Sequence, residues 1–436
     1  MVDSIAILCS SLLSLIFSIG AASAAISAPA SSPAKPWMHT ETRLRLVTTA
    51  FRGIGDRTPQ ELAKDFPMVI CNATPDPKAL HEGNPDCKVF KYFLGPYVGK
   101  SEMEKLPPEA MAHDKDGKVT KAREWENWLV QPDSPQWIEY VVGMSTKFFD
   151  KGFDGIYTDS MGTAPLGVYL YSRPINPQTG KEYTPQEWLA AESKMAEAIR
   201  EKFPKDKILI MNGLGPGSRY WAEPEAASPR ALLKYYDGAL SESTFRSARQ
   251  KLTEWPNEKD WMADLRMIQD VQKRGIMGYW YAKTWGDGNT SNDEPNAKEL
   301  VPQWRRFALA SYLLSAGPDS YFMFDTRKND KNGAEYFPEY DAPLGIAVEE
   351  MQKSQSGIYF RHYKNGLTIV NPSDKQAADV SIPGTKNKIY VNWGIYKKSA
   401  SQPTGSIVHG KAEEFEVIKF PATIPAHSGM ILTLRD

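Results

Sequence analysis

The sequence predicts an α/β protein in which a (β/α)8 TIM barrel is followed by a C-terminal antiparallel β-sandwich. From about residue 43, short apolar runs alternate with helical segments. Strands that alternate with helices form a parallel sheet whose faces are covered. After about residue 345 the helical period disappears, and short strand-like runs follow one another, which is typical of a sandwich.

Eight apolar runs have the length and boundaries of barrel strands, and eight is the number at which such a sheet closes. These predicted strands are residues 44–50, 68–72, 89–94, 153–159, 208–212, 238–242, 276–281 and 320–325. Thr58 and Thr184 each open a helix with a capping box and a proline at the first helical position. In the second of these helices Trp188 and Met195 keep helical spacing and should face the sheet. Residues 95–133 form a loop longer than a minimal barrel needs.

The predicted β-sandwich consists of short runs without helical period. They are residues 357–364, 367–371, 378–382, 388–393, 414–420 and 430–434. Asn365-Gly366, between the first two runs, is a strong signal for a two-residue hairpin turn. The sequence thus divides into a signal peptide at 1–24, a linker at 25–40, the barrel at 41–345 and the sandwich at 346–436.

The N-terminus has the pattern of an export signal. Residues 5–22 are apolar, and Ala22-Ser23-Ala24 is a small-residue cleavage motif. The preceding segment contains Asp3 and neither Lys nor Arg, so an uncleaved anchor helix is the alternative. No later segment is long and apolar enough to cross a bilayer. The sequence therefore predicts a secreted or periplasmic protein with no membrane partner after cleavage.

Cysteine usage agrees with export. Cys9 lies in the leader, so the mature chain keeps only Cys71 and Cys87. An isolated pair in an oxidising compartment predicts one disulfide, with two free buried thiols as the alternative.

Charge and motifs exclude several classes of function. The formal net charge is −1, which gives no electrostatic reason to expect nucleic acid as a partner. None of the six histidines ends a predicted barrel strand, which argues against a metal site and against a Ser–His or Cys–His nucleophile. The chain also lacks a G-x-S-x-G motif, a Walker A loop and a G-x-G-x-x-G in a βαβ context. We therefore expect no metal and no cofactor.

Two carboxylates end predicted strands. Asp159 ends the fourth and Glu242 the sixth, and active-site residues of such barrels lie at the C-terminal strand ends. Cleavage of a glycosidic bond needs two carboxyl groups, one of which donates a proton to the leaving oxygen. We expect Glu242 to be this acid and Asp159 to be the nucleophile, or the base in an inverting enzyme. The structural alternatives are a helix N-cap for Asp159 and a salt bridge at the rim for Glu242.

Other residues at the predicted strand ends are candidates for substrate binding: Tyr92, Asn212, Trp280, Tyr281, Lys283 and Asp325. Asn212 and Tyr281 are suited to orient sugar hydroxyls, and Lys283 to pair with one of the acids. Flat tryptophan rings suit the faces of pyranose rings, although ordinary packing is the alternative for each. Tryptophans that fall in or near the expected mouth are Trp125, Trp128, Trp221, Trp280 and Trp285.

Two segments around these carboxylates resemble a known family. The run Gly152-Phe153-Asp154-Gly155-Ile156-Tyr157-Thr158-Asp159 and the run Asp237-Gly238-Ala239-Leu240-Ser241-Glu242 are similar to motifs of the endo-α-1,4-polygalactosaminidase family and related glycosyl-hydrolase-like barrel families. By this resemblance Asp159 takes the place of the family's catalytic aspartate and Glu242 that of its glutamate. Ser243-Thr244 replaces the usual glycine, so the resemblance carries the fold and the acid pair further than the specificity.

The leading hypothesis is a glycosidase that acts on a polysaccharide or glycan. A non-catalytic carbohydrate-binding protein on a degenerate barrel is the alternative, and it is favoured if Asp159 and Glu242 lie far apart or in structural salt bridges. A metal-dependent hydrolase, such as a deacetylase, would need histidine ligands at the mouth.

Overall fold

The computed structural model describes residues 38–51, 53–167, 169–247, 250–286, 289–290, 294–326, 334–397 and 408–435. The predicted signal peptide, Cys9 and most of the predicted linker lie outside these residues. His39–Asp436 forms one compact unit. None of the helices in the described part of the chain is both long and apolar enough to span a membrane.

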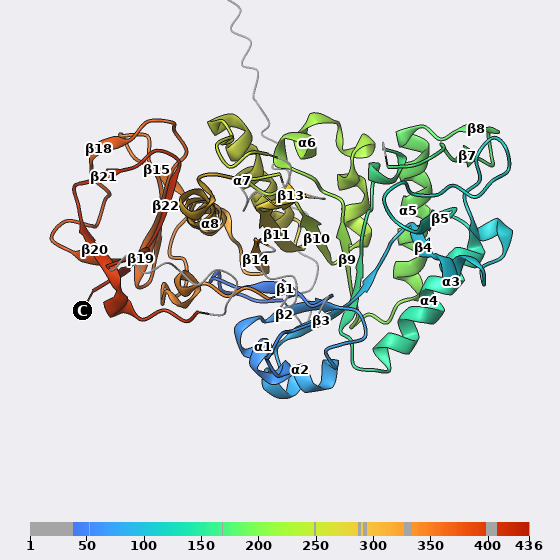
Figure 1. Cartoon of the computed structure of the whole chain (residues 1–436), viewed down its shortest axis with the longest axis horizontal. Helices are drawn as coiled ribbons and strands as arrows, with labels where there is room; N and C mark the ends of the chain where they lie inside the picture. Colours follow the sequence, from blue (N-terminus) through green and yellow to red (C-terminus); the bar gives the residue numbers. More distant parts are fainter. Residues whose placement is uncertain are drawn as a thin grey trace, which may run out of the picture. The chain divides into compact units, whose positions relative to one another are not determined.

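An eight-stranded parallel sheet forms the first part of this unit (Figure 1). Its strands, in spatial and chain order, are β1 (Val47–Thr49), β2 (Met68–Cys71), β3 (Lys88–Phe93), β6 (Gly155–Thr158), β9 (Ile208–Asn212), β10 (Gly238–Ser241), β11 (Met277–Lys283) and β14 (Ser320–Asp325). A parallel bridge between Leu46 and Phe322 links the first strand to the last. The prediction of eight parallel strands in this order is confirmed.

Helices lie between these strands, as the alternating pattern predicted. They are α1 (Pro59–Asp65), α2 (Pro77–Gly83), α4 (Pro135–Phe149), α5 (Pro185–Lys202), α6 (Gly217–Ala222), α7 (Glu258–Lys273) and α8 (Ala297–Ser315), with the 3-10 helices η3 (Glu225–Ala227) and η4 (Pro229–Tyr235) after α6. Both predicted capping boxes are present, at Thr58 and Thr184. Trp188 and Met195 are buried, as their spacing predicted.

The long segment 95–133 is more structured than a loop. It contains β4 (Tyr97–Gly99), α3 (Lys100–Met103), η1 (Pro108–Ala110) and β5 (Asn127–Leu129), and β4 pairs with β5. The segment after β6 adds η2 (Ala164–Leu166) and the pair β7 (Ile175–Asn176) and β8 (Lys181–Glu182). A bridge between Ala122 and Leu170 joins the two excursions. A further short pair, β12 (Trp285–Gly286) and β13 (Asn289–Thr290), follows β11.

The C-terminal part is an antiparallel sheet. In spatial order its strands are β15 (Gln352–Lys353), β16 (Tyr359–Tyr363), β17 (Gly366–Asn371), β22 (Ser428–Leu434), β19 (Ile389–Tyr396) and β20 (Phe415–Lys419). A separate ladder pairs β18 (Ala377–Val380) with β21 (Ala422–Ile424), and η6 (Pro338–Asp341) and η7 (Ala412–Glu414) are 3-10 turns. The antiparallel class is confirmed. The predicted hairpin is present, but its two turn residues are Lys364 and Asn365, because Tyr363 pairs with Gly366.

Helix α8 joins the two sheets. The Tyr363 hydroxyl donates to the carbonyl oxygen of Leu313 at 2.7 Å, and the Arg361 guanidinium donates to that of Ala316 at 2.7 Å. These donors satisfy carbonyl groups that a helix C-terminus leaves without intrahelical partners. Gly429 packs against the backbone of α8, since a Cβ atom there would lie 2.4 Å from the carbonyl oxygen of Arg306.

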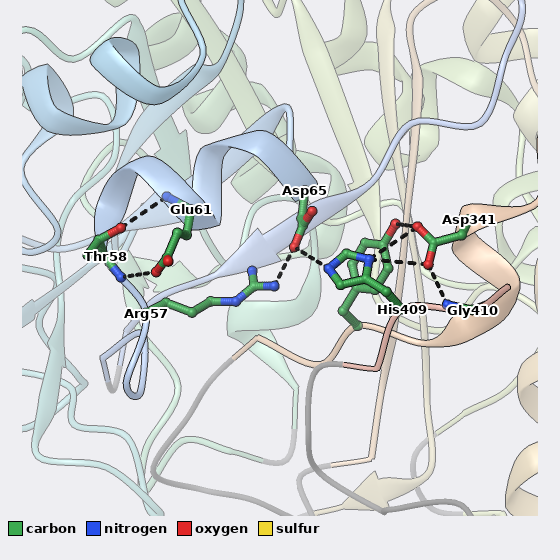
Figure 2. A network of polar contacts seen from close by, with 8 residues as sticks. Arg57, Thr58, Glu61, Asp65, Asp341, His409 and Gly410 are labelled. Carbon is green, nitrogen blue, oxygen red and sulfur yellow. Dashed lines mark hydrogen bonds and ion pairs between the residues drawn. The ribbon is translucent and has the colours of Figure 1, made fainter.

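A polar network connects α1 with the segments around η6 and residue 410 (Figure 2). Asp65 pairs with Arg57 and lies 3.6 Å from Nε2 of His409, and Nδ1 of His409 lies 3.2 Å from Asp341. The Gly410 amide donates to Asp341 at 2.7 Å. The His409 side chain is 56% exposed, so its contacts with Asp65 and Asp341 add little to stability.

The predicted disulfide is wrong. Cys71 and Cys87 are both buried free thiols, and each donates to a carbonyl oxygen. The strand register explains this, because Cys71 pairs with Lys91 whereas Cys87 precedes the partner of Met68. The two cysteines are therefore four residues out of register, about 13 Å along the strands. A disulfide needs Cα atoms within roughly 7 Å.

Candidate active site

Six polar side chains lie at the C-terminal ends of the barrel strands. The parallel arrangement brings these ends to one rim of the sheet. Tyr92, Asn212, Lys283 and Asp325 lie at or next to the last residues of β3, β9, β11 and β14, and Asp159 and Glu242 directly follow β6 and β10. Strand direction places these residues at one rim, and their contacts decide which of them meet.

Asp159 is half-buried and accepts hydrogen bonds from three donors. The Tyr92 hydroxyl donates to Oδ2 at 2.6 Å, and the Asn212 side-chain amide donates to Oδ1 at 2.7 Å. The Ser160 backbone amide also donates to Oδ1 at 2.7 Å. Ser160 adopts a left-handed conformation, with φ of 58°, that turns the chain sharply after β6. The carboxyl group is thereby fixed in one orientation.

Glu242 meets Asp159 through a shared partner. The Asn212 amide nitrogen that donates to Asp159 also donates to Oε1 of Glu242 at 3.0 Å. The Lys283 ammonium lies 3.2 Å from Oε2 of Glu242. The Glu242 side chain is 42% exposed whereas that of Lys283 is 10% exposed, so the glutamate is the more accessible member of the ion pair.

The environment of the acid pair perturbs ionisation. Burial raises the pKa of Asp159 above its ordinary value, and the negative charge of Glu242 raises it further. The hydrogen bonds from Tyr92, Asn212 and Ser160 oppose this shift, because they stabilise the carboxylate. Burial and the charge of Asp159 raise the pKa of Tyr92 well above its usual range. Tyr92 therefore keeps its proton and acts as a donor.

Tyr281 and Asp325 form a second polar pair at the rim. The Tyr281 hydroxyl donates to Oδ2 of Asp325 at 2.6 Å, and both residues are buried. The Lys283 ammonium lies 5.2 Å from the centre of the Tyr281 ring. This pair therefore packs beside Lys283, and the Tyr281 hydroxyl is engaged by Asp325.

Trp280 is not at the mouth, which corrects the prediction that it binds substrate. Its side chain is 0% exposed, and its indole N–H donates to the Ser320 hydroxyl at 2.8 Å. Successive side chains of a strand point to opposite faces. Since Tyr281 and Lys283 point to the side of the acid pair, Trp280 points the other way, into the packed core.

The other tryptophans singled out in the sequence differ in exposure. Trp125 and Trp221 are exposed, and the indole N–H of Trp221 donates to the carbonyl oxygen of Ala263 at 3.1 Å. Trp128 is half-buried beneath the Lys121 ammonium, which lies 5.0 Å from its ring. The side chain of Trp285 lies outside the described residues.

Two buried acids next to the site were missed by the sequence analysis. Glu192 lies on α5 and Asp264 on α7. A signal existed, because each stands in the apolar stripe of its helix: Glu192 between Trp188 and Met195, and Asp264 beside Leu265. A carboxyl group in such a stripe is costly to bury and so calls for a specific partner.

Comparison with known proteins identifies a matching family and several solved structures that resemble this chain. Residues 81–367 match the model of a family described as hypothetical glycosyl hydrolase family 15. No curated protein matches the sequence. A solved structure of the MutB E254Q mutant in complex with sucrose has 11% identity and a TM-score of 0.50, and the alignment covers 92% of this chain and 100% of that one.

Two further solved structures align with part of this chain at low identity. The glycoside hydrolase domain of PelA from Pseudomonas aeruginosa has 12% identity and a TM-score of 0.43, with 67% of this chain and 98% of that one covered. Aspergillus fumigatus Ega3 in complex with galactosamine has 12% identity and a TM-score of 0.41, with 69% and 97% covered.

Proposed function

We propose that this chain, which belongs to hypothetical glycosyl hydrolase family 15, cleaves the glycosidic bonds of a polysaccharide or glycan with Asp159 and Glu242. Family membership makes the chain a glycosidase with a carbohydrate substrate. The observation that supports the two residues is their shared hydrogen bond to the Asn212 amide at the C-terminal rim of the barrel. Glu242 pairs with Lys283 at the rim, but its side chain remains 42% exposed and so accessible to a substrate.

We propose a retaining mechanism, to which the close approach of one oxygen atom of each acid is suited. Two oxygen atoms that lie 2.7 and 3.0 Å from one nitrogen are separated from each other by less than about 6 Å. Retaining glycosidases hold their carboxyl groups roughly 5–5.5 Å apart, and inverting enzymes roughly 6.5–9.5 Å apart. In the proposed reaction Asp159 attacks the anomeric carbon to form a glycosyl ester while Glu242 protonates the leaving oxygen. Glu242 then removes a proton from the water that hydrolyses the ester.

The contacts of each acid support these separate roles. Three donors surround Asp159 and orient it, and they oppose the rise in its pKa that burial and the charge of Glu242 cause. Glu242 is the more exposed acid, with room to reach a glycosidic oxygen. Tyr92, Asn212 and Lys283 are proposed to contact the sugar, and the buried pair of Tyr281 and Asp325 to support Lys283.

The remaining proposals concern the rest of the chain. Residues 1–24 are proposed to be a cleaved signal peptide followed by a linker to residue 40, and the mature protein to be secreted or periplasmic. The barrel at 41–345 is proposed to carry the active site, and the sheets at 346–436 to form a β-sandwich.

The decisive experiment measures the release of reducing ends from a panel of polysaccharides. The chain would be compared with Asp159→Asn, Glu242→Gln and the control Asp237→Asn. Asp237 is buried and accepts a hydrogen bond from the Leu209 amide, but it precedes β10 and so lies at the opposite rim. We expect hydrolysis by the parent and the control, and its loss in both acid variants. Activity that survives in either acid variant would overturn the assignment.

A further inference from the structure

We propose that Glu192 and Asp264 are positioning residues whose buried carboxyl groups fasten the loops that carry Asp159 and Glu242. The inference rests on the proposed function of those two acids. Each carboxyl group binds the backbone amide of the third residue after a catalytic acid: Gly162 follows Asp159 by three residues, and Phe245 follows Glu242 by three.

Glu192 holds the loop after β6. Its side chain is 0% exposed. Oε2 accepts a hydrogen bond from the Gly162 amide at 2.6 Å, and Oε1 accepts one from the indole N–H of Trp188 at 3.0 Å. Trp188 lies one turn earlier on α5, so it fixes the carboxyl group relative to the helix. The loop that begins at Asp159 is thereby tied to α5.

The backbone of the same loop packs closely against neighbouring backbone at two glycines, where a larger residue would clash. A Cβ atom at Gly95 would lie 2.0 Å from the carbonyl oxygen of Asp159, and one at Gly213 would lie 2.3 Å from that of Met161. The Met161 amide donates to the carbonyl oxygen of Asn212 at 2.7 Å. At the Gly162 amide a side chain from α5 reaches this turn.

Asp264 holds two loops together. Oδ2 accepts a hydrogen bond from the Phe245 amide at 2.8 Å, and Oδ1 accepts one from the Gly217 amide at 2.5 Å. Gly217 begins α6, which follows the strand of Asn212, and Phe245 lies in the loop that follows Glu242. Asp264 therefore connects the segment that follows Asn212 with the loop that follows Glu242.

Both loops adopt a conformation that needs such support. Ser160 and Phe245 have φ values of 58° and 63°, in the left-handed region that residues with a Cβ atom adopt at a cost. Such conformations persist when surrounding contacts fix them. In the part of the chain that the structure describes, neither Glu192 nor Asp264 lies in an ion pair, so hydrogen bonds from backbone amides, and from the Trp188 indole for Glu192, compensate for burial.

The test compares Glu192→Gln and Asp264→Asn with the parent and with Asp237→Asn. An amide keeps the size of the side chain but offers one oxygen to two N–H donors. Loss of one such bond predicts a decrease in kcat of about 10- to 100-fold. We expect KM to change less than about threefold, because the loops orient the acids and do not hold the sugar. The control should lose stability and keep kcat.

A rescue variant separates positioning from a general loss of structure. In Glu192→Gln the side chain has one oxygen for two donors, so the indole N–H of Trp188 competes with the Gly162 amide for it. Adding Trp188→Phe removes that donor and lets the glutamine oxygen accept from Gly162. We expect the double variant to have a higher kcat than Glu192→Gln alone. No recovery, with a normal fold, would contradict the role of Glu192.

Hydrogen exchange of backbone amides tests the contacts of Glu192 and Asp264 with the loops, and it needs no substrate. Exchange in peptides spanning residues 160–165 and 243–247 should accelerate in the respective variant, and remain unchanged in the control. If Asp159→Asn is inactive but Glu192→Gln and Asp264→Asn keep full kcat and slow exchange, the positioning role is wrong and the proposed function stands. If Asp159→Asn stays active, the proposed function fails. Hydrogen exchange then decides by itself whether Glu192 and Asp264 hold the two loops.

Discussion

Asp159 and Glu242 accept hydrogen bonds from one and the same amide nitrogen, which belongs to Asn212. The two acids come from different strands, and the strand between them supplies the donor that sets their spacing. The amide has no charge, so it brings two carboxyl groups together without neutralising either. The negative charge of Glu242 raises the pKa of Asp159.

Removal of this bridge should reduce catalysis more than binding. A hydrogen bond to a charged group contributes about 1.5–3 kcal/mol, so Asn212→Ala is expected to lower kcat/KM by about 10- to 100-fold. Asn212→Asp should lower it further, because a third carboxyl group repels the other two. Steady-state kinetics on the best substrate of the panel measures both. Asn84→Ala is the control, since its amide donates to the carbonyl oxygen of Ala63 far from the rim. Equal kinetics in Asn212→Ala and the parent would refute the bridge.

Leaving-group dependence should separate the roles of the two acids. A nitrophenolate leaves a sugar without protonation, so Glu242→Gln should keep much more activity on a nitrophenyl glycoside than on the polysaccharide. Asp159→Asn should lose activity on both, because every substrate needs the nucleophile. The comparison uses the nitrophenyl glycoside of the sugar that the panel identifies. The reverse pattern would exchange the two roles.

The stability of the fold should depend on the ionisation of Asp264. Burial raises the pKa of this carboxyl group to about 7 from an ordinary value of 3.8. The folded state therefore binds a proton more tightly than the unfolded state, and the resulting stabilisation is complete below about pH 4 and is lost as the pH rises through 7. The change amounts to about 4 kcal/mol. Urea unfolding between pH 4 and 8 should show this decrease for the parent and a flatter profile for Asp264→Asn. Parallel profiles would show that Asp264 does not titrate in this range.

The two buried thiols should be unreactive in the folded protein. Burial raises the pKa of both Cys71 and Cys87 to about 12, and the thiolate is the reactive form. A thiol reagent at pH 8 should label neither residue until denaturant is added, and both afterwards. A reducing agent should leave the melting temperature unchanged, because no disulfide between them is present to reduce. A decrease in melting temperature on reduction would instead support a disulfide between Cys71 and Cys87.

Local patterns predicted the fold well because they repeat along the chain. Each barrel strand is an apolar run next to a helix with its own start signal, so an error of one or two residues at a boundary leaves the order intact. Asp159 and Glu242 follow such runs directly, and strand direction alone places them at one rim. Sequence position was sufficient to place these two residues at the rim, and their roles remain a proposal.

The failures concern properties that depend on neighbouring strands. Trp280 and Tyr281 are adjacent in sequence, and only the phase of β11 against its neighbours decides which of them faces the acids. The distance between Cys71 and Cys87 depends on the register of β2 and β3. Glu192 and Asp264 each interact with amides of a different segment, so nothing within their own helices reveals the partner. Strand register and long-range hydrogen bonds therefore could not be predicted from the local sequence pattern.

The contacts of helix α8 limit which parts of this enzyme can be exchanged during evolution. Its C-terminal carbonyl groups are satisfied by Arg361 and Tyr363 of the antiparallel sheet, and its backbone touches Gly429. A chain shortened after residue 345 would keep all six rim residues. The C-terminal carbonyl groups of α8 would lose these hydrogen-bond donors, and the side of α8 that packs against the antiparallel sheet would be exposed to solvent. Recombination that exchanges the C-terminal sheet for another module is therefore expected to fail unless α8 is exchanged with it. Catalytic and non-catalytic parts should have diverged together as a single unit.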